Sequence, residues 1–161
     1  MKAIIALFVL LFLVLIGIVV AQNYISKNPS FLLKNTATVT IKDTKFKVEV
    51  AKEPKDRETG FSGRNSLSDK NGMIFKFDHP DYYSFWMKSM KFPLDIIFIS
   101  NDKVVTIYKN LEAPSKDNES LRTYQPTAPS DIVLEINAGL SDKYGIKEGD
   151  KVKIENLGAD K

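Results

Sequence analysis

The chain has 161 residues, 43% of them hydrophobic, and a formal net charge of +3 at pH 7. A chain of this length builds one folded domain with a core of its own. The absence of cysteine excludes disulfide bonds, thiolate catalysis and cysteine metal sites. Lysines and acidic residues are interspersed without a basic block, so nucleic-acid binding is not expected.

The first twenty-one residues are the most apolar part of the chain. Residues 3–21 carry no charge and no hydrogen-bonding side chain. As a helix they span roughly 28 Å, close to the roughly 30 Å hydrocarbon core of a bilayer. We therefore expect residues 1–21 to be a single-pass anchor in the cell membrane. Lys2 then stays inside, and the rest of the chain is extracytoplasmic.

A cleaved signal peptide is the alternative for the same segment. Val19, Val20 and Ala21 stand at positions that a signal peptidase reads, and Gln22 opens a polar stretch. Signal-peptide apolar cores usually run about 7–15 residues, which is shorter than this one. The retained anchor is therefore preferred. Cleavage would instead make the domain a secreted protein.

Residues 22–35 are interpreted as a tether, because Pro29 interrupts any helix and no apolar period persists. Residues 36–157 are assigned to one domain and residues 158–161 to a tail. The domain starts with segments 36–41 and 45–50, which alternate apolar and polar residues. This alternation predicts a hairpin in which Phe46, Val48 and Val50 face the core and Glu49 faces the solvent.

Further elements follow at short spacing. Residues 53–60 suit one or two helical turns, with Pro54 near the start and Gly60 as the stop signal. A turn is expected at 78–81, and Asn101-Asp102 suits the turn of a hairpin. Residues 137–145 suit a short helical turn closed by Gly145. We predict the remaining strands at 72–77, 83–88, 94–100, 103–109, 131–136 and 151–156.

The domain is therefore predicted to be all-β. Short strands without a long helix after the anchor favour an antiparallel sandwich or barrel-like fold with one or two short helices. Residues 111–130 break the pattern, with three prolines and no periodicity. A loop of that length in a compact domain is usually functional.

Motifs for common chemistries are absent. His79, the one histidine, lies between Asp78 and Asp81, which is too few ligands for an ordinary zinc site, so a plain turn is preferred. Phosphate-binding loops, dinucleotide fingerprints and zinc-protease motifs are missing, and no serine elbow accompanies the histidine. We expect no metal and no cofactor.

Two carboxylates lie within apolar strands. Asp95 belongs to a segment that is apolar on both faces, and Glu135 shares its face with Val133. An ionised carboxylate buried there needs a partner. The candidate partners in the sequence are Arg57, Arg64, Lys88 and Arg122.

Two interpretations of these charges stay open. In the first, Arg64, Asp95 and Glu135 form structural ion pairs that set the strand register. In the second, they line a pocket with Trp86, Lys88 and Tyr124. Asp95 and Glu135 would then share acid and base roles in glycan hydrolysis, or Trp86 would stack on a sugar ring without catalysis.

Six short blocks of sequence occur in a recognisable order. They are Arg57-x-x-Gly60-Phe61-x-x-Arg64, Gly72-Met73-Ile74-Phe75, Phe85-Trp86-Met87-Lys88, PLDIIFI at 93–99, Val133-Leu134-Glu135-x-x-Ala138-Gly139 and Gly145-Ile146-x-x-Gly149-Asp150. Over about residues 44–156 this order resembles the domain of unknown function 192 family. The resemblance implies a prokaryotic, often exported β-sandwich protein with short helices and no agreed activity.

The resemblance also implies which positions matter. The family's polar positions fall on Arg57, Arg64, Trp86, Lys88, Asp95 and Glu135. The chain departs from the family in two places. Phe61 stands where many members have Met, and the loop before Tyr124 lacks the cysteines that many members carry there.

We predict a membrane-anchored extracytoplasmic module that binds a small molecule, an envelope polymer or a protein partner without catalysis. The predicted ligand-binding residues are Arg57, Arg64, Trp86, Lys88, Asp95, Tyr124 and Glu135. One alternative is a hydrolase of an envelope polymer or glycan with Asp95 and Glu135 as its carboxylate pair. A second is a structural scaffold that uses loop 111–130.

Overall fold

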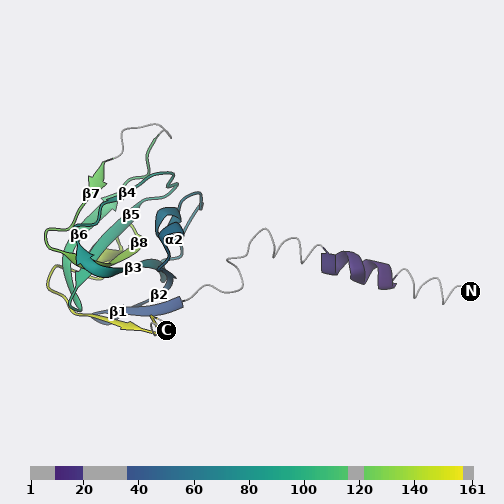
Figure 1. Cartoon of the computed structure of the whole chain (residues 1–161), viewed down its shortest axis with the longest axis horizontal. Helices are drawn as coiled ribbons and strands as arrows, with labels where there is room; N and C mark the ends of the chain where they lie inside the picture. The colour runs from purple at the N-terminus through teal and green to yellow at the C-terminus, as the bar shows by residue number, and fades with distance from the viewer. Residues whose placement is uncertain (1–9, 20–35, 116–121, 158–161) are drawn as a thin grey trace, which may run out of the picture. The chain divides into compact units, whose positions relative to one another are not determined.

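The computed structural model describes residues 10–19, 36–115 and 122–157. The chain divides into two units, Met1–Lys34 and Asn35–Lys161. In the first unit, residues 10–19 form a helix, drawn in purple in Figure 1. No helix of the described residues combines the length and apolarity needed to cross a bilayer. The rest of the predicted anchor, the tether at 22–35 and the tail at 158–161 lie outside the described residues.

The described part of the second unit is built from strands with two short helices (Figure 1). In chain order its elements are β1 (Thr36–Ile41), β2 (Thr44–Ala51), α2 (Pro54–Thr59), β3 (Asn71–Asp81), β4 (Phe85–Trp86), β5 (Leu94–Ser100), β6 (Lys103–Leu111), β7 (Thr123–Tyr124), β8 (Ser130–Asn137), α3 (Leu140–Lys143) and β9 (Val152–Glu155). This confirms a mostly β domain.

One sheet joins seven of these strands in the order β6-β5-β8-β3-β2-β1-β9, and β4 pairs with β7 separately. The neighbours in the main sheet are antiparallel except β2 and β3, which are parallel. A parallel pair requires a crossover. Residues 52–70, which include α2, carry the chain across one face of the sheet before β3 begins.

The main sheet curls until its edge strands meet. Lys103 of β6 forms a bridge with Lys151, next to β9. The Val104 N–H donates to the Asp150 carbonyl at 3.0 Å, and the Val152 N–H donates to the Asp102 carbonyl at 2.9 Å. Of the two predicted forms, the sheet therefore has the barrel-like one. It is not a sandwich of two stacked sheets, because its edge strands bond to each other.

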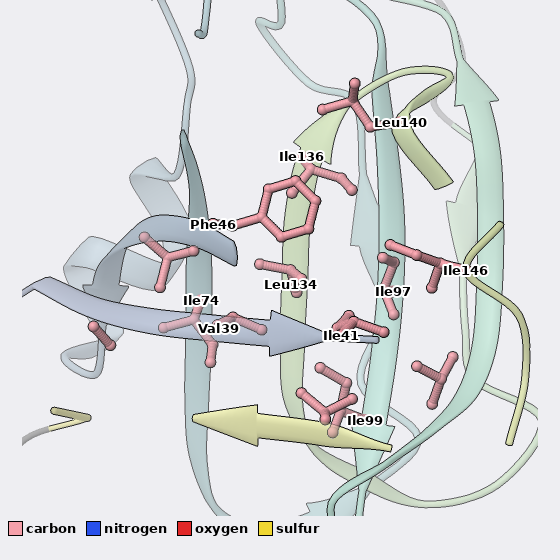
Figure 2. Packing of buried hydrophobic residues seen from close by; sticks show 14 residues of the cluster. Val39, Ile41, Phe46, Ile74, Ile97, Ile99, Leu134, Ile136, Leu140 and Ile146 are labelled. Atoms are coloured by element: carbon pink, nitrogen blue, oxygen red, sulfur yellow. The ribbon is translucent and has the colours of Figure 1, made fainter. Parts of the chain in front are cut away.

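An aliphatic core fills the inside of the curl, and every strand of the main sheet contributes to it (Figure 2). We call the side of the sheet that carries Ile74, Ile97 and Leu134 the inner face. Phe46 and Val48 point to this face, as predicted, and both are fully buried. Leu140 of α3 packs against the same core.

A second core, rich in aromatic residues, covers the opposite side of the sheet, which we call the outer face. Phe75, Ile96 and Phe98 lie there, beneath Phe61 and Met87. Strands β3, β5 and β8 are therefore buried on both faces. Their apolar sequences follow from this double burial.

Three elements differ from the prediction. The expected turn at 78–81 is the irregular end of β3, where the register with β8 shifts between Lys76 and Asp81. Pro80, which has no N–H, fits such an interrupted ladder. The strand expected at 83–88 is reduced to β4, and loop 111–130 contains β7. Both short strands form because Phe85 pairs with Tyr124.

A close backbone approach at Gly72 sets the spacing between β3 and β8. A β-carbon added at this buried glycine would lie 2.7 Å from the Glu135 carbonyl oxygen and 3.2 Å from a Val48 methyl carbon. By contrast, a β-carbon at Gly149 would meet nothing within 4 Å, and only its positive φ of +86° opposes substitution.

We predict that Gly72→Ala destabilises the fold by about 2–3 kcal/mol, because overpacking forces β3 away from β8. Gly149→Ala is the control and should cost about 1 kcal/mol, the strain of a left-handed residue. Urea unfolding of the full chain measures both. Equal costs for the two variants would contradict the close approach at Gly72.

Candidate functional site

A cavity of about 290 Å³ opens on the outer face of the sheet. Its walls come from α2 and the turn after it, from β3, from β4 and its flanks, and from β8. Six aromatic side chains line it: Phe61, Phe75, Phe77, Tyr83, Phe85 and Trp86. The four charged residues in its lining are Arg57, Glu58, Lys88 and Glu135.

Ring contacts hold the aromatic walls in place. Phe77 and Tyr83 stack with centroids 3.6 Å apart, and Phe75 meets Phe85 edge to face at 5.1 Å. The Tyr83 hydroxyl donates to the His79 carbonyl at 2.9 Å. Trp86 is 45% exposed although it lines the cavity. Four of the rings therefore pack against one another, and the ring of Trp86 reaches the solvent.

Glu135 is the buried ionisable group that lines the cavity. It extends from β8 toward the outer face, between Met73 of β3 and Ile96 of β5, and is 5% exposed. Its carboxyl group has no hydrogen bond or ion pair to any described residue. Burial raises the pKa of Glu135 from 4.5 to about 8. The group is therefore mostly protonated at neutral pH and can donate a hydrogen bond.

The predicted ion pairs to Glu135 do not form within the described residues. Arg57, Arg64, Lys88 and Arg122 were its candidate partners, and none bonds to it. The physical reason is geometric, because the guanidinium of Arg57 bonds backbone carbonyls and that of Arg64 bonds Glu49. The register role proposed for this carboxylate is therefore wrong.

Two cationic side chains line the cavity. Arg57 is held in place, since it donates to the carbonyl of Lys76 at 3.1 Å and to that of Lys52. Its guanidinium also lies 4.9 Å from the centre of the Phe77 ring. The exposed ammonium of Lys88 has no bond to a described side chain or carbonyl. Trp86 and Lys88 thus line the same cavity, although β4 ends at Trp86.

Arg64 is outside the cavity lining and acts on it indirectly. Its two Nη atoms bond both oxygens of Glu49, at 2.6 and 2.7 Å, and its guanidinium lies 5.0 Å from the Phe61 ring centre. Burial lowers the pKa of Arg64. The expectation that Glu49 faces solvent is wrong in this respect, because the segment after α2 partly covers that face of β2.

Asp95 and Glu135 lie on opposite faces of the sheet. In the antiparallel pairing of β5 with β8, Asp95 stands opposite Ile136 and Glu135 stands opposite Ile96. Directly opposed residues share a face, and successive residues alternate. Asp95 therefore points to the inner face and Glu135 to the outer face. They cannot serve as the carboxylate pair of a hydrolase, and Asp95 does not belong to the cavity.

Asp95 instead organises the backbone around it. It is fully buried, and its Oδ1 accepts from the N–H groups of Asn110 (2.8 Å) and Gly139 (3.1 Å). Its Oδ2 accepts from the Ser141 N–H at 2.8 Å. These bonds join the end of β6 to the start of α3. Backbone N–H groups therefore stabilise the buried Asp95 carboxylate, and it forms no ion pair with a described arginine.

Tyr124, the remaining predicted site residue, supports the cavity from behind. It pairs with Phe85 across β4 and β7, and its ring centre lies 5.1 Å from that of Tyr108. It is absent from the cavity lining. The segment around it is fixed, since Gln125 Nε2 donates to Ser84 Oγ at 2.9 Å. Residues 116–121 of the predicted loop lie outside the described part.

Most of the aromatic walls were missed at the level of sequence. Phe61, Phe77 and Tyr83 carry no charge that would single them out. The alternation of Phe75 and Phe77 was a signal, since both rings had to share a face. His79 is exposed, and no group of three or more His, Cys, Asp or Glu within the described ranges is arranged to hold a metal.

The bonds of Asp95 predict a large cost for a small change. Asp95→Asn should destabilise the fold by about 2–4 kcal/mol, because an amide cannot accept all three N–H bonds and loses the charge that strengthens them. Asp142→Asn is the control. It removes an exposed ion pair with Lys109 and should cost less than about 1 kcal/mol. Chemical unfolding tests both, and similar costs would refute the role of Asp95.

Glu135 predicts a pH-dependent stability. The folded chain holds its proton more tightly than the unfolded chain, so its contribution to stability is complete below about pH 4.5 and declines up to about pH 8. Glu135→Gln cannot ionise. We expect the unfolding free energy of E135Q to rise by about 2–4 kcal/mol relative to the parent between pH 5 and 8.5. A difference that stays constant with pH would contradict a protonated Glu135.

Two solved structures are similar to this chain. A protein of unknown function from Novosphingobium aromaticivorans is 37% identical, with a TM-score of 0.62 over 73% of this chain and 83% of that one. A protein from Sinorhizobium meliloti, described as a candidate transcription regulator, is 30% identical, with a TM-score of 0.63 over 75% of this chain and 93% of that one. A search of curated proteins found no match.

A family model also matches most of the folded unit. It covers residues 37–154 and describes the domain of unknown function 192 family as an "Uncharacterized ACR". The match spans β1 to β9 and includes every residue that lines the cavity. The chain belongs to the domain of unknown function 192 family.

Proposed function

We propose that this protein is a binding module that holds a small organic ligand in the cavity on the outer face of the sheet. One observation carries the proposal. Glu135 opens into an aromatic cavity, and its buried carboxyl group has no partner among the described residues. A buried polar group without a partner is costly. A ligand atom that accepts a hydrogen bond from Glu135 would remove that cost.

The cavity also has the composition of a ligand site. Such sites combine apolar walls with a few polar groups that orient the ligand, and most measure about 300–1,000 Å³. At about 290 Å³ this cavity suits a small molecule. Its aromatic walls would contact a planar or ring-shaped body. Binding without catalysis is favoured because the second predicted carboxylate, Asp95, points to the other face.

The compartment belongs to the same proposal. The apolar character of residues 3–21 supports a membrane anchor at residues 1–21 and an extracytoplasmic position for the cavity. Cleavage after Ala21 would release the same module as a secreted protein. Several surface lysines pair with acids, as Lys109 does with Asp142.

A thermal-shift screen of the full chain tests the proposal. The panel contains aromatic acids, amino acids and neutral and charged monosaccharides. A true ligand at 100 times its Kd should stabilise the parent by about 3 kcal/mol, a shift of several degrees in Tm. Trp86→Ala should abolish this shift by removing one wall of the cavity.

Tyr82→Ala is the matched control for that screen. Tyr82 is 51% exposed, close to the 45% of Trp86, but it does not line the cavity. The ligand-induced shift should therefore persist in Y82A. A shift that survives Trp86→Ala, or a panel in which no compound raises the Tm of the parent, would reject the cavity as the binding site.

A further inference from the structure

We propose that the ligand of this cavity is a small organic anion, with a planar apolar body between the aromatic walls and an anionic group held by Lys88 and Glu135. This inference rests on the proposed function and names its ligand class. It follows from the charges that face the cavity, the hydrogen-bonding role of Glu135 and the shape of the walls.

The charge around the cavity favours an anion. Arg57 and Glu58 from α2 and Lys88 from the segment after β4 face it, together with Glu135 from β8. Strand β3 contributes the uncharged rings of Phe75 and Phe77, and burial raises the pKa of Tyr83, which keeps that phenol neutral. With Glu135 protonated, two positive charges face one negative charge.

Nearby charges do not alter this balance. Glu49 shares the outer face with Glu135, one strand beyond Met73, but both of its oxygens bond Arg64. On the other side, β5 presents Ile96 and its apolar neighbours. The excess positive charge therefore stays with Arg57 and Lys88, and the Lys88 ammonium forms no bond with a described residue.

Glu135 adds selectivity for the protonation state of the ligand. A neutral carboxyl group donates a hydrogen bond, and an anionic oxygen is the strongest acceptor for it. An ammonium ligand would need Glu135 to lose its proton and would approach beside two cations. The Glu135 carboxyl group, which has no partner among the described residues, therefore favours binding of an anion and disfavours binding of a cation.

The affinity for such an anion should depend on pH. The complex requires the Glu135 proton, so affinity is constant while the group is protonated. It falls toward tenfold per pH unit once Glu135 ionises, above about pH 8. A cationic ligand would show the opposite dependence, because its binding would release the proton.

Three probes with the same ring test the inference by calorimetry on the full chain: phenylacetate, phenylacetamide and phenethylamine. At pH 6.5 we expect phenylacetate to bind at least tenfold more tightly than the other two. Its Kd should rise at least fivefold between pH 6.5 and 9. In Glu135→Gln, whose amide still donates but cannot ionise, the Kd should be independent of pH.

Lysine variants locate the anionic group. Lys88→Gln should reduce the preference for phenylacetate over phenylacetamide to less than threefold. Lys91→Gln is the matched control, since Lys91 is exposed, bonds Asn65 at 3.1 Å and does not line the cavity. It should leave the preference unchanged. Retention of the preference in Lys88→Gln would overturn the assignment of Lys88.

The outcomes separate this inference from the proposed function. Equal binding of phenylacetate and phenylacetamide, or tighter binding of phenethylamine, would overturn the inference that the ligand is an anion. The proposal that the cavity binds a small organic ligand would still stand. Absence of phenylacetate binding overturns the anion as well. It overturns the proposed function only if the thermal screen also finds no ligand that depends on Trp86.

Discussion

Burial of strands β3, β5 and β8 on both faces is the constraint on which the rest of this structure depends. The curled sheet encloses an aliphatic core on its inner face. Its outer face would be exposed if residues 52–70 and the β4–β7 pair did not cover it. The cover is incomplete, and the cavity is the place where aromatic side chains leave space.

Double burial also decides the state of the two carboxylates within the apolar parts of β5 and β8. Asp95 and Glu135 lie on neighbouring strands, one position apart in register, and meet the same cost of desolvation. Asp95 accepts three backbone N–H bonds on the inner face. On the outer face no described donor reaches Glu135, and burial raises the pKa of its carboxyl group to about 8. One carboxylate therefore serves the fold, and the other is available to a ligand.

Local features of the sequence predicted much of the fold. Alternation and turn residues located the hairpins β1–β2 and β5–β6, because a tight turn with Asn101 and Asp102 at positive φ depends on residues close in sequence. Four of the seven predicted site residues line one cavity: Arg57, Trp86, Lys88 and Glu135. Arg64 and Tyr124 support its walls, and Asp95 lies on the other face.

The sequence by itself determined three facts: the chain lacks thiols, its folded domain is mostly β after an apolar N-terminal segment, and two carboxylates lie in apolar strands. The sequence identified two carboxylates whose burial has a high desolvation free energy, because that free energy depends only on residue type and apolar neighbours. The tertiary structure decided the parallel β2–β3 pair, the meeting of β6 with β9 and the face to which each carboxylate points. Those properties depend on pairing between distant strands, and in a strand a shift of one residue in register exchanges the two faces.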